Sequence, residues 1–237
     1  MKLLHGIQLI GCALIMGVLT TYAAEPATTR PAIDPQADAI LKKMSDYLTS
    51  SQSMSFQAFA ITEDLLPSGQ KVDFARNTTV RVARPNRLAA IITGDMEDLQ
   101  FFYDGVQATI YNPKNNVYGQ IPLPDNIDAA LETLAHKYNM VIALADLVQS
   151  NPYKALSPLI RSGEYLGTGY VFNTKCHHLA FRQETVDWQI WIDQGDKPLP
   201  RKLVITYKDN PARLQYVAFF SQWDLGAVFP AGTFTFT

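Results

Sequence analysis

Residues 72–82, VDFARNTTVRV, alternate apolar and polar side chains along most of their length. Toward the two ends of the stretch, even-numbered positions are apolar, at Val72, Phe74, Val80 and Val82. The polar residues Asp73, Asn77, Thr79 and Arg81 occupy odd-numbered positions. Because successive side chains of a strand point to opposite faces, this spacing predicts a β-strand with one buried face.

Ten further stretches on either side have the same strand character. They span residues 54–62, 87–93, 99–103, 107–111, 117–122, 165–172, 177–184, 186–193, 199–207 and 214–223. Turn sequences such as Pro67-Ser68-Gly69 and Asp104-Gly105 join neighbouring stretches, which predicts hairpins and an antiparallel sheet. About eleven strands in one sheet curl rather than lie flat, so we expect a strongly curved sheet that forms an unclosed β-barrel.

Two segments have helical spacing instead. Asp34 is a good N-cap before Pro35, and the following turns place apolar side chains on one face at Ala37, Ile40, Leu41, Met44, Tyr47 and Leu48. A helical insertion of about residues 125–162 separates the two runs of strands. The fold class is therefore α+β, and we expect the helices to bury their apolar faces against the concave side of the sheet.

The N-terminus has the form of a secretory signal. Lys2 precedes an apolar run over residues 7–19, and small residues at Ala23 and Ala24 precede the first acid, Glu25. A membrane anchor is the alternative, but the run is shorter than the roughly 20 residues of a spanning helix. Lipidation at Cys12 is a second alternative, although the apolar run continues past that cysteine. We expect cleavage near Ala23–Ala24 and a periplasmic protein without stable membrane insertion.

The mature chain is predicted to be one domain, residues 34–237, after a flexible leader at 25–33. Its length is enough to bury about 70% of the unfolded surface. Removing residues 1–24 takes the net charge from −2 to −3, which is too mild to indicate nucleic acid as a partner. Only Cys176 remains, so no internal disulfide can form.

No arrangement of residues indicates catalysis. In Cys176-His177-His178 at most two side chains share a face of a strand, whereas zinc takes three or four ligands. The sequence also has no Gly-x-Ser-x-Gly elbow, phosphate loop or Gly-x-Gly-x-x-Gly. We therefore predict no catalytic residue, no metal site and no cofactor.

Apolar and aromatic residues are in surplus on the predicted strands. Strands that are apolar on both sides are covered on both sides or line a cavity, and such a sheet suits an apolar ligand. The candidates for the cavity are Ile40, Met44, Phe56, Phe74, Phe101, Tyr103, Trp188, Ile190 and Phe220. Each is also compatible with an ordinary packed core.

A set of short motifs resembles the periplasmic lipoprotein carriers, the LolA/LolB-like proteins. The motifs are Val82-Ala83-Arg84-Pro85-Asn86, Tyr103-Asp104-Gly105 and Tyr111-Asn112-Pro113, with Phe234-Thr235-Phe236-Thr237 similar to the family's closing strand. Trp191-Ile192-Asp193 and the following Lys197-Pro198-Leu199-Pro200-Arg201 are similar to related envelope proteins, including anti-sigma-factor regulators. The best match is to an uncharacterised periplasmic branch of this superfamily.

The resemblance implies an eleven-stranded unclosed barrel whose helix-covered concave face holds acyl chains. It places Arg84 where the carriers have an arginine that bonds to the helical lid and keeps the empty cavity shut. Two departures matter: the insertion at 125–162 differs in sequence, and the chain ends at Thr237 where the carriers continue, so a docking element is expected to be missing.

We therefore predict a non-enzymatic periplasmic protein that binds a lipid, a lipidated protein or another apolar ligand such as an acyl chain. The alternative is a signalling or scaffolding module that uses the same fold to bind an envelope protein, and a hydrolase is third.

The processing prediction is open to direct test. The mature N-terminus should be Ala24 or Glu25, and the protein should leave cells in the osmotic-shock fraction, because the signal is removed on export. N-terminal sequencing measures this, and an intact Met1 on membrane-bound protein would contradict it.

Overall fold

The alternating stretch forms the longest hairpin of the sheet in the computed structural model. Strand β2 (Lys71–Ala83) pairs antiparallel with β1 (Ser53–Leu65) on one side and with β3 (Arg87–Gly94) on the other. The structure describes residues 32–237 except 141 and 143. The predicted signal peptide and most of the predicted leader lie outside the described residues.

The predicted strands are present at nearly the predicted bounds. The remaining ones are β4 (Asp98–Tyr103), β5 (Gln107–Asn112), β6 (Val117–Pro122), β7 (Ser162–Val171), β8 (Thr174–Arg182), β9 (Val186–Asp193), β10 (Pro200–Tyr207) and β11 (Gln215–Leu225). Across the described residues they form one eleven-stranded antiparallel sheet in the order β6-β5-β4-β3-β2-β1-β11-β10-β9-β8-β7. Because β6 and β7 are the two edges and do not pair, the sheet is unclosed, and the predicted fold class is confirmed.

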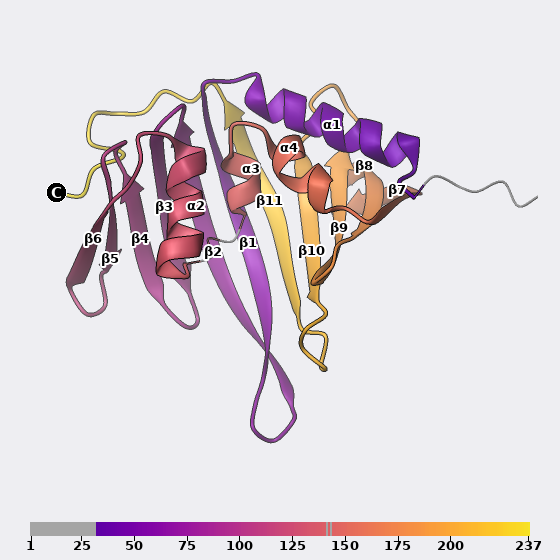
Figure 1. Cartoon of the computed structure of the whole chain (residues 1–237), viewed down its shortest axis with the longest axis horizontal. Helices are drawn as coiled ribbons and strands as arrows, with labels where there is room; N and C mark the ends of the chain where they lie inside the picture. Colours follow the sequence, from indigo (N-terminus) through magenta and orange to yellow (C-terminus); the bar gives the residue numbers. More distant parts are fainter. Residues whose placement is uncertain (1–31, 141, 143) are drawn as a thin grey trace, which may run out of the picture. The chain divides into compact units, whose positions relative to one another are not determined.

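The helices lie on one side of this sheet (Figure 1). They are α1 (Pro35–Thr49), α2 (Ile127–Tyr138), α3 (Ala145–Val148) and α4 (Pro152–Leu156), followed by a 3₁₀ turn at Ser157–Leu159. Asp34 caps α1 by accepting from the Gln36 N–H at 2.7 Å, and Asn126 caps α2 by accepting from the Ala129 N–H at 2.8 Å. The cap at Asn126 explains why α2 begins two residues later than the helical pattern predicts. None of the helices in the described residues is long and apolar enough to cross a bilayer.

The apolar core lies between these helices and the face of the sheet that they cover, which we call the concave face. Ala37, Leu41, Met44 and Leu48 of α1 are completely buried in it. Phe56, Tyr103 and Phe181 are the largest side chains with almost no exposed surface. The cover is therefore packed core over much of the sheet, and α1 contacts β7 and α4 directly.

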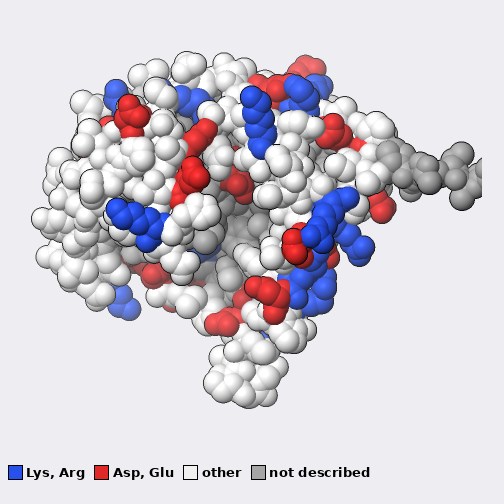
Figure 2. Space-filling view, viewed as in Figure 1, with Lys and Arg blue, Asp and Glu red and all other residues white. Residues whose placement is uncertain are grey.

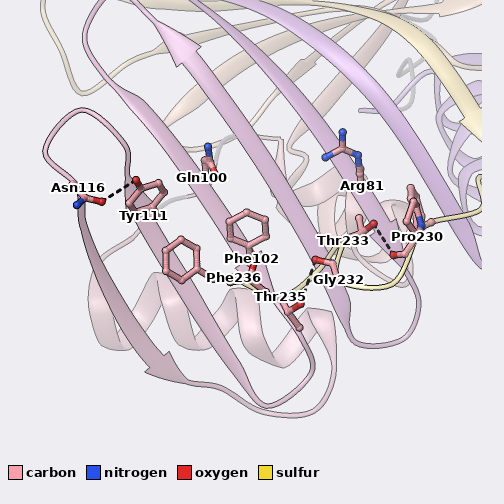
Figure 3. A pocket seen from close by; sticks show the side chains of 12 residues that line it. Arg81, Gln100, Phe102, Tyr111, Asn116, Pro230, Gly232, Thr233, Thr235 and Phe236 are labelled. Atoms are coloured by element: carbon pink, nitrogen blue, oxygen red, sulfur yellow. Dashed lines mark hydrogen bonds between the residues drawn. The ribbon is translucent and has the colours of Figure 1, made fainter.

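The predicted closing strand at Phe234–Thr237 is wrong. β11 is the last strand, and it already pairs with β1 and β10 on its two sides, so the chain beyond it has no free strand edge to join there. The tail at residues 226–237 instead turns over the sheet face opposite α2 (Figure 3). Its Phe236 ring packs 6.1, 4.9 and 5.1 Å from the rings of Phe102, Tyr111 and Tyr118.

This docking predicts a small stabilising role for the tail. Phe236→Ala should lower the free energy of unfolding by about 1 kcal/mol, because it removes three aromatic contacts from a partly exposed site. It should also speed the removal of tail residues by a carboxypeptidase. Denaturant unfolding and timed digestion measure the two effects, with Val228→Ala, whose side chain is 93% exposed, as the matched control. Equal stability and equal digestion of Phe236→Ala and the control would contradict the docking.

Candidate functional site

A cavity of about 250 Å³ lies between the concave face and five described residues of the insertion. Figure 2 shows that the face carrying the helices is hollowed in its middle, with acidic and basic side chains near the hollow. The sheet side of the cavity is lined by Phe56, Arg76, Thr78, Val80, Leu88, Ala90, Ile92, Leu99, Phe101, Ile110 and Tyr216, with Glu97 from the β3–β4 turn. The insertion side is lined by Met140, Ile142, Leu144, Ala145 and Val148. Apart from two charged residues, one threonine and one tyrosine, the walls are apolar.

The strand register explains why space remains here. Ala90 on β3 lies between its cross-strand partners Val80 and Phe101 on the concave face. An alanine between larger neighbours leaves room that a longer side chain would fill. The cavity therefore results from the small side chain of Ala90, where the neighbouring positions on the concave face carry larger side chains.

Arg84 connects the end of β2 to the insertion. Its Nη1 donates to the carbonyl oxygens of Val148 at 2.8 Å and Gln149 at 2.9 Å, at the end of α3. The next residue, Pro85, accepts at its carbonyl from the backbone N–H of Ile127, where α2 begins. The Arg84-Pro85 junction thus contacts the start of α2 and the end of α3. Val148 itself lines the cavity. We call the two Arg84 hydrogen bonds the Arg84 tie.

The guanidinium of Arg84 is only partly hydrogen-bonded. Within the described residues, the buried Nε and Nη2 of the same guanidinium have no hydrogen-bond partner. Burial lowers the pKa of Arg84, and the charge of Asp128 acts in the opposite direction. Two charge-assisted hydrogen bonds contribute about 1.5–3 kcal/mol each, and an unsatisfied buried donor costs about 1–3 kcal/mol. Since these effects are comparable, the closed cover is held with a modest net free energy.

A second connection holds α4 to α1. The backbone N–H of Tyr153 donates to Ser45 Oγ at 2.9 Å, and the Tyr153 hydroxyl donates to Asp38 Oδ1 at 2.7 Å. Ser45 is buried among the apolar residues of α1, so this hydrogen bond satisfies a polar group in the core. The hydrogen bond of Tyr153 to Asp38 is also the largest cause of the raised pKa of Tyr153.

The predicted cavity residues separate into two groups. Phe56 and Phe101 line the cavity. The others pack elsewhere: Met44, Tyr103, Trp188, Ile190 and Phe220 are buried in the core, Ile40 is partly buried against it, and Phe74 is partly exposed near the far end of β2. Trp188, for example, stacks on Phe181 at 4.4 Å, far along the sheet order from β2 and β3. Tyr103 uses its hydroxyl to donate to the carbonyl of Pro124.

Several lining residues were missed. The apolar run at 140–148 was visible in the sequence, but nothing in its pattern indicated that Met140, Ile142 and Leu144 face a cavity. Glu97 was missed because it lies in an acidic turn, which normally indicates solvent. Arg76 was missed because a charged side chain is rarely buried, although it has the same parity as the apolar residues of its strand. Only the register that places Arg76 opposite Gly94 brings the two residues to the same end of the β2–β3 hairpin.

The Cys176-His177-His178 residues pack as ordinary strand side chains. Cys176 is buried, and desolvation raises the pKa of its thiol to about 11. His177 Nδ1 lies 3.1 Å from the Tyr165 hydroxyl, while His178 stacks on Trp191 at 4.0 Å and contacts Gln189. Among the residues that the structure describes, no three His, Cys, Asp or Glu side chains are placed to hold a metal ion.

A second hollow, of about 650 Å³, surrounds the tail on the opposite face (Figure 3). Its walls include Arg81, Gln100 and Tyr111 from the sheet and Gly232, Thr235 and Phe236 from the tail. It is open, and the tail itself forms much of its wall. It therefore offers less enclosure to an apolar ligand than the cavity under the insertion.

Comparison with known proteins places this chain among periplasmic proteins. Residues 37–237 match the family described as "Predicted periplasmic protein (DUF2092)". No curated protein matches the chain. The family match confirms the predicted periplasmic localisation, and the predicted resemblance to LolA-like proteins is found as a likeness of fold.

Three solved structures illustrate the similarity. A LolA superfamily protein from Nitrosomonas europaea is 14% identical, with a TM-score of 0.39, over 84% of this chain and 97% of that chain. The lipoprotein LppX from Mycobacterium tuberculosis is 10% identical, with a TM-score of 0.47, over 82% and 98%. MucB in the Pseudomonas aeruginosa MucA/MucB complex is 13% identical, with a TM-score of 0.43, over 85% and 61%. At sequence identities this low, the ligands and partners of these proteins cannot be inferred for this chain.

The packing of the cysteine and histidines predicts that they are dispensable for binding. Cys176→Ser and His178→Ala should leave apolar-ligand affinity unchanged and lower the free energy of unfolding by about 1–2 kcal/mol. Titration with a fluorescent fatty acid, denaturant unfolding and metal analysis measure these properties. Stoichiometric zinc in the wild type that is lost in either variant would contradict the packing interpretation.

Proposed function

We propose that this chain, which belongs to the DUF2092 family of predicted periplasmic proteins, binds an apolar chain beneath its helical insertion and performs no chemistry of its own. The ligand is a lipid, the acyl part of a lipidated protein or another molecule with an apolar chain. The observation that carries the proposal is the apolar cavity under a cover that a partly satisfied arginine holds in place.

The size of the cavity limits what fits beneath the insertion in the position that the structure shows. Pockets for small molecules commonly have volumes of about 300–1,000 Å³, and this cavity has about 250 Å³. One short apolar chain fits such a space, whereas a larger lipid fits only when the insertion moves outward. Ligand size and cover position are therefore coupled.

The Arg84 tie is the element that sets the position of the cover. When only the open form accepts ligand, the apparent affinity falls in proportion to the open fraction. A tie with a modest net free energy keeps that fraction small without making it negligible. Arg84 is thus the proposed lock of the lid, and the helices α2 and α3 that it contacts are the proposed lid.

The apolar cavity also separates this function from the alternative of an envelope scaffold. A module that binds proteins on its surface has no need for a cavity in its concave face, and filling that cavity with larger side chains would stabilise it. The cavity therefore favours a ligand-binding protein.

Replacing Arg84 tests the lock. Arg84→Leu should keep the fold and bind a fluorescent fatty acid more tightly, or release it more slowly, by about tenfold, because about 1.4 kcal/mol of closing free energy corresponds to a factor of ten. Equilibrium titration and stopped-flow dissociation measure the change, and thermal unfolding confirms the fold.

Two further variants serve as controls. Arg87→Leu removes an exposed arginine from the neighbouring strand and should leave affinity and dissociation rate unchanged. Ala90→Phe places a ring inside the cavity and should abolish probe binding while the protein stays folded. If Arg84→Leu matches the wild type in both affinity and rate, Arg84 is not a lock. If probe binding survives in Ala90→Phe, the cavity is not the site.

A further inference from the structure

The cavity contains two charged side chains in an otherwise apolar wall. Arg76 extends from the concave face of β2, four residues before Val80, and Glu97 extends from the turn between β3 and β4. The strand pairing places Arg76 opposite Gly94, three residues before Glu97. Both charges therefore belong to the same end of the cavity, away from the end of β2 that bears Arg84.

Neither charge has an ion-pair partner among the described residues. In the part of the chain that the structure describes, Arg76 and Glu97 form no ion pair with each other or with any other side chain. Arg76 instead lies over the ring of Tyr216, with its guanidinium carbon 5.4 Å from the ring centroid. Its position is half-buried, whereas Glu97 is exposed.

The other acids of this turn are already engaged. Asp95 Oδ2 accepts from the backbone N–H of Ala75 at 2.7 Å, and Asp98 Oδ1 accepts from the backbone N–H of Gly94 at 3.3 Å. These bonds fix the turn and keep both carboxylates on backbone donors. Glu97 is consequently the acid of the turn that lines the cavity.

Along β2 the wall changes from apolar to polar to charged, through Val80, Thr78 and Arg76. With about 3.4 Å per residue, this gradient extends over about 14 Å. An amphiphile matches it with its chain toward Val80 and its head toward Arg76 and Glu97. A head with one negative and one positive group complements both charges, while a purely anionic head meets repulsion from Glu97 and a purely cationic head meets repulsion from Arg76.

We infer that the cavity selects amphiphiles with a zwitterionic head, whose carboxylate or phosphate pairs with Arg76 and whose ammonium pairs with Glu97. This inference rests on the proposed function and specifies its ligand class. Arg76 supplies the larger share of the selectivity, because it is half-buried and its planar donors suit a carboxylate or phosphate. Glu97 contributes less, since exposed ion pairs are weak.

A series of twelve-carbon ligands tests the inference by calorimetry below their micelle concentrations. The series is dodecylphosphocholine, dodecanoate, dodecyltrimethylammonium and dodecanol, which share a chain and differ in head charge. Wild type should bind dodecylphosphocholine about tenfold more tightly than dodecanol. Arg76→Gln should weaken dodecylphosphocholine and dodecanoate about tenfold and leave dodecanol unchanged. Glu97→Gln should weaken dodecylphosphocholine and dodecyltrimethylammonium about twofold to threefold and strengthen dodecanoate.

The control is Arg81→Gln, which removes the same charge from the opposite face of β2 and should leave all four affinities as in wild type. Equal binding of the four ligands to wild type would overturn the inference while leaving the proposed function intact, and this readout holds even if Arg76→Gln fails to fold. Equal losses of affinity in Arg81→Gln and Arg76→Gln would also overturn it. The net charge of the protein, and not the position of the arginine, would then determine the affinity. If none of the four ligands binds, the proposed function fails together with the inference.

Discussion

The contact between the Arg84 guanidinium and the carbonyls of Val148 and Gln149 determines how the two parts of this fold meet. A curved, unclosed sheet has an apolar concave face that must be covered, because exposed apolar surface costs about 25 cal/mol per Å². Over β7–β10 the cover is packed core. Over β2–β5 it is the insertion, which leaves a cavity beneath it and contacts β2 through Arg84. The position of the insertion therefore depends on polar contacts, among them the two hydrogen bonds of Arg84, as well as on packing.

The two connections of the helical cover differ in character. Tyr153 and Ser45 hold α4 to α1 with satisfied groups in a packed environment. Arg84 holds α3 with one nitrogen bonded twice and two nitrogens buried without partners in the described structure. A connection of the first kind is expected to persist, while one of the second kind opens at lower cost. If the chain binds a ligand as proposed, this difference makes the α2–α3 side of the cover the expected entrance.

The sequence predicted the strands well because their signals are local. Alternation and turn residues place β1–β11 to within about three residues of their bounds, and the predicted cap at Asp34 marks where α1 begins. The division between cavity and core was not predictable, because Trp188 and Phe101 have the same local pattern and only the packing of α1 and the insertion distinguishes them. The tail was misjudged because Phe234-Thr235-Phe236-Thr237 resembles the closing strand of the carriers, whereas both edges of β11 are already paired. The alternation along β2 places Arg76 on the apolar face, but its position at the same end of the cavity as Glu97 depends on the register between β2 and β3.

The central claim is that the space under the insertion holds an apolar chain in the cell. Native mass spectrometry of the protein purified from its own periplasm, without added lipid, tests it most directly. The account predicts a bound amphiphile of uniform stoichiometry on the wild type and none on Ala90→Phe, whose added ring occupies the same space. Wild-type protein that carries no more lipid than the blocked variant would contradict the account.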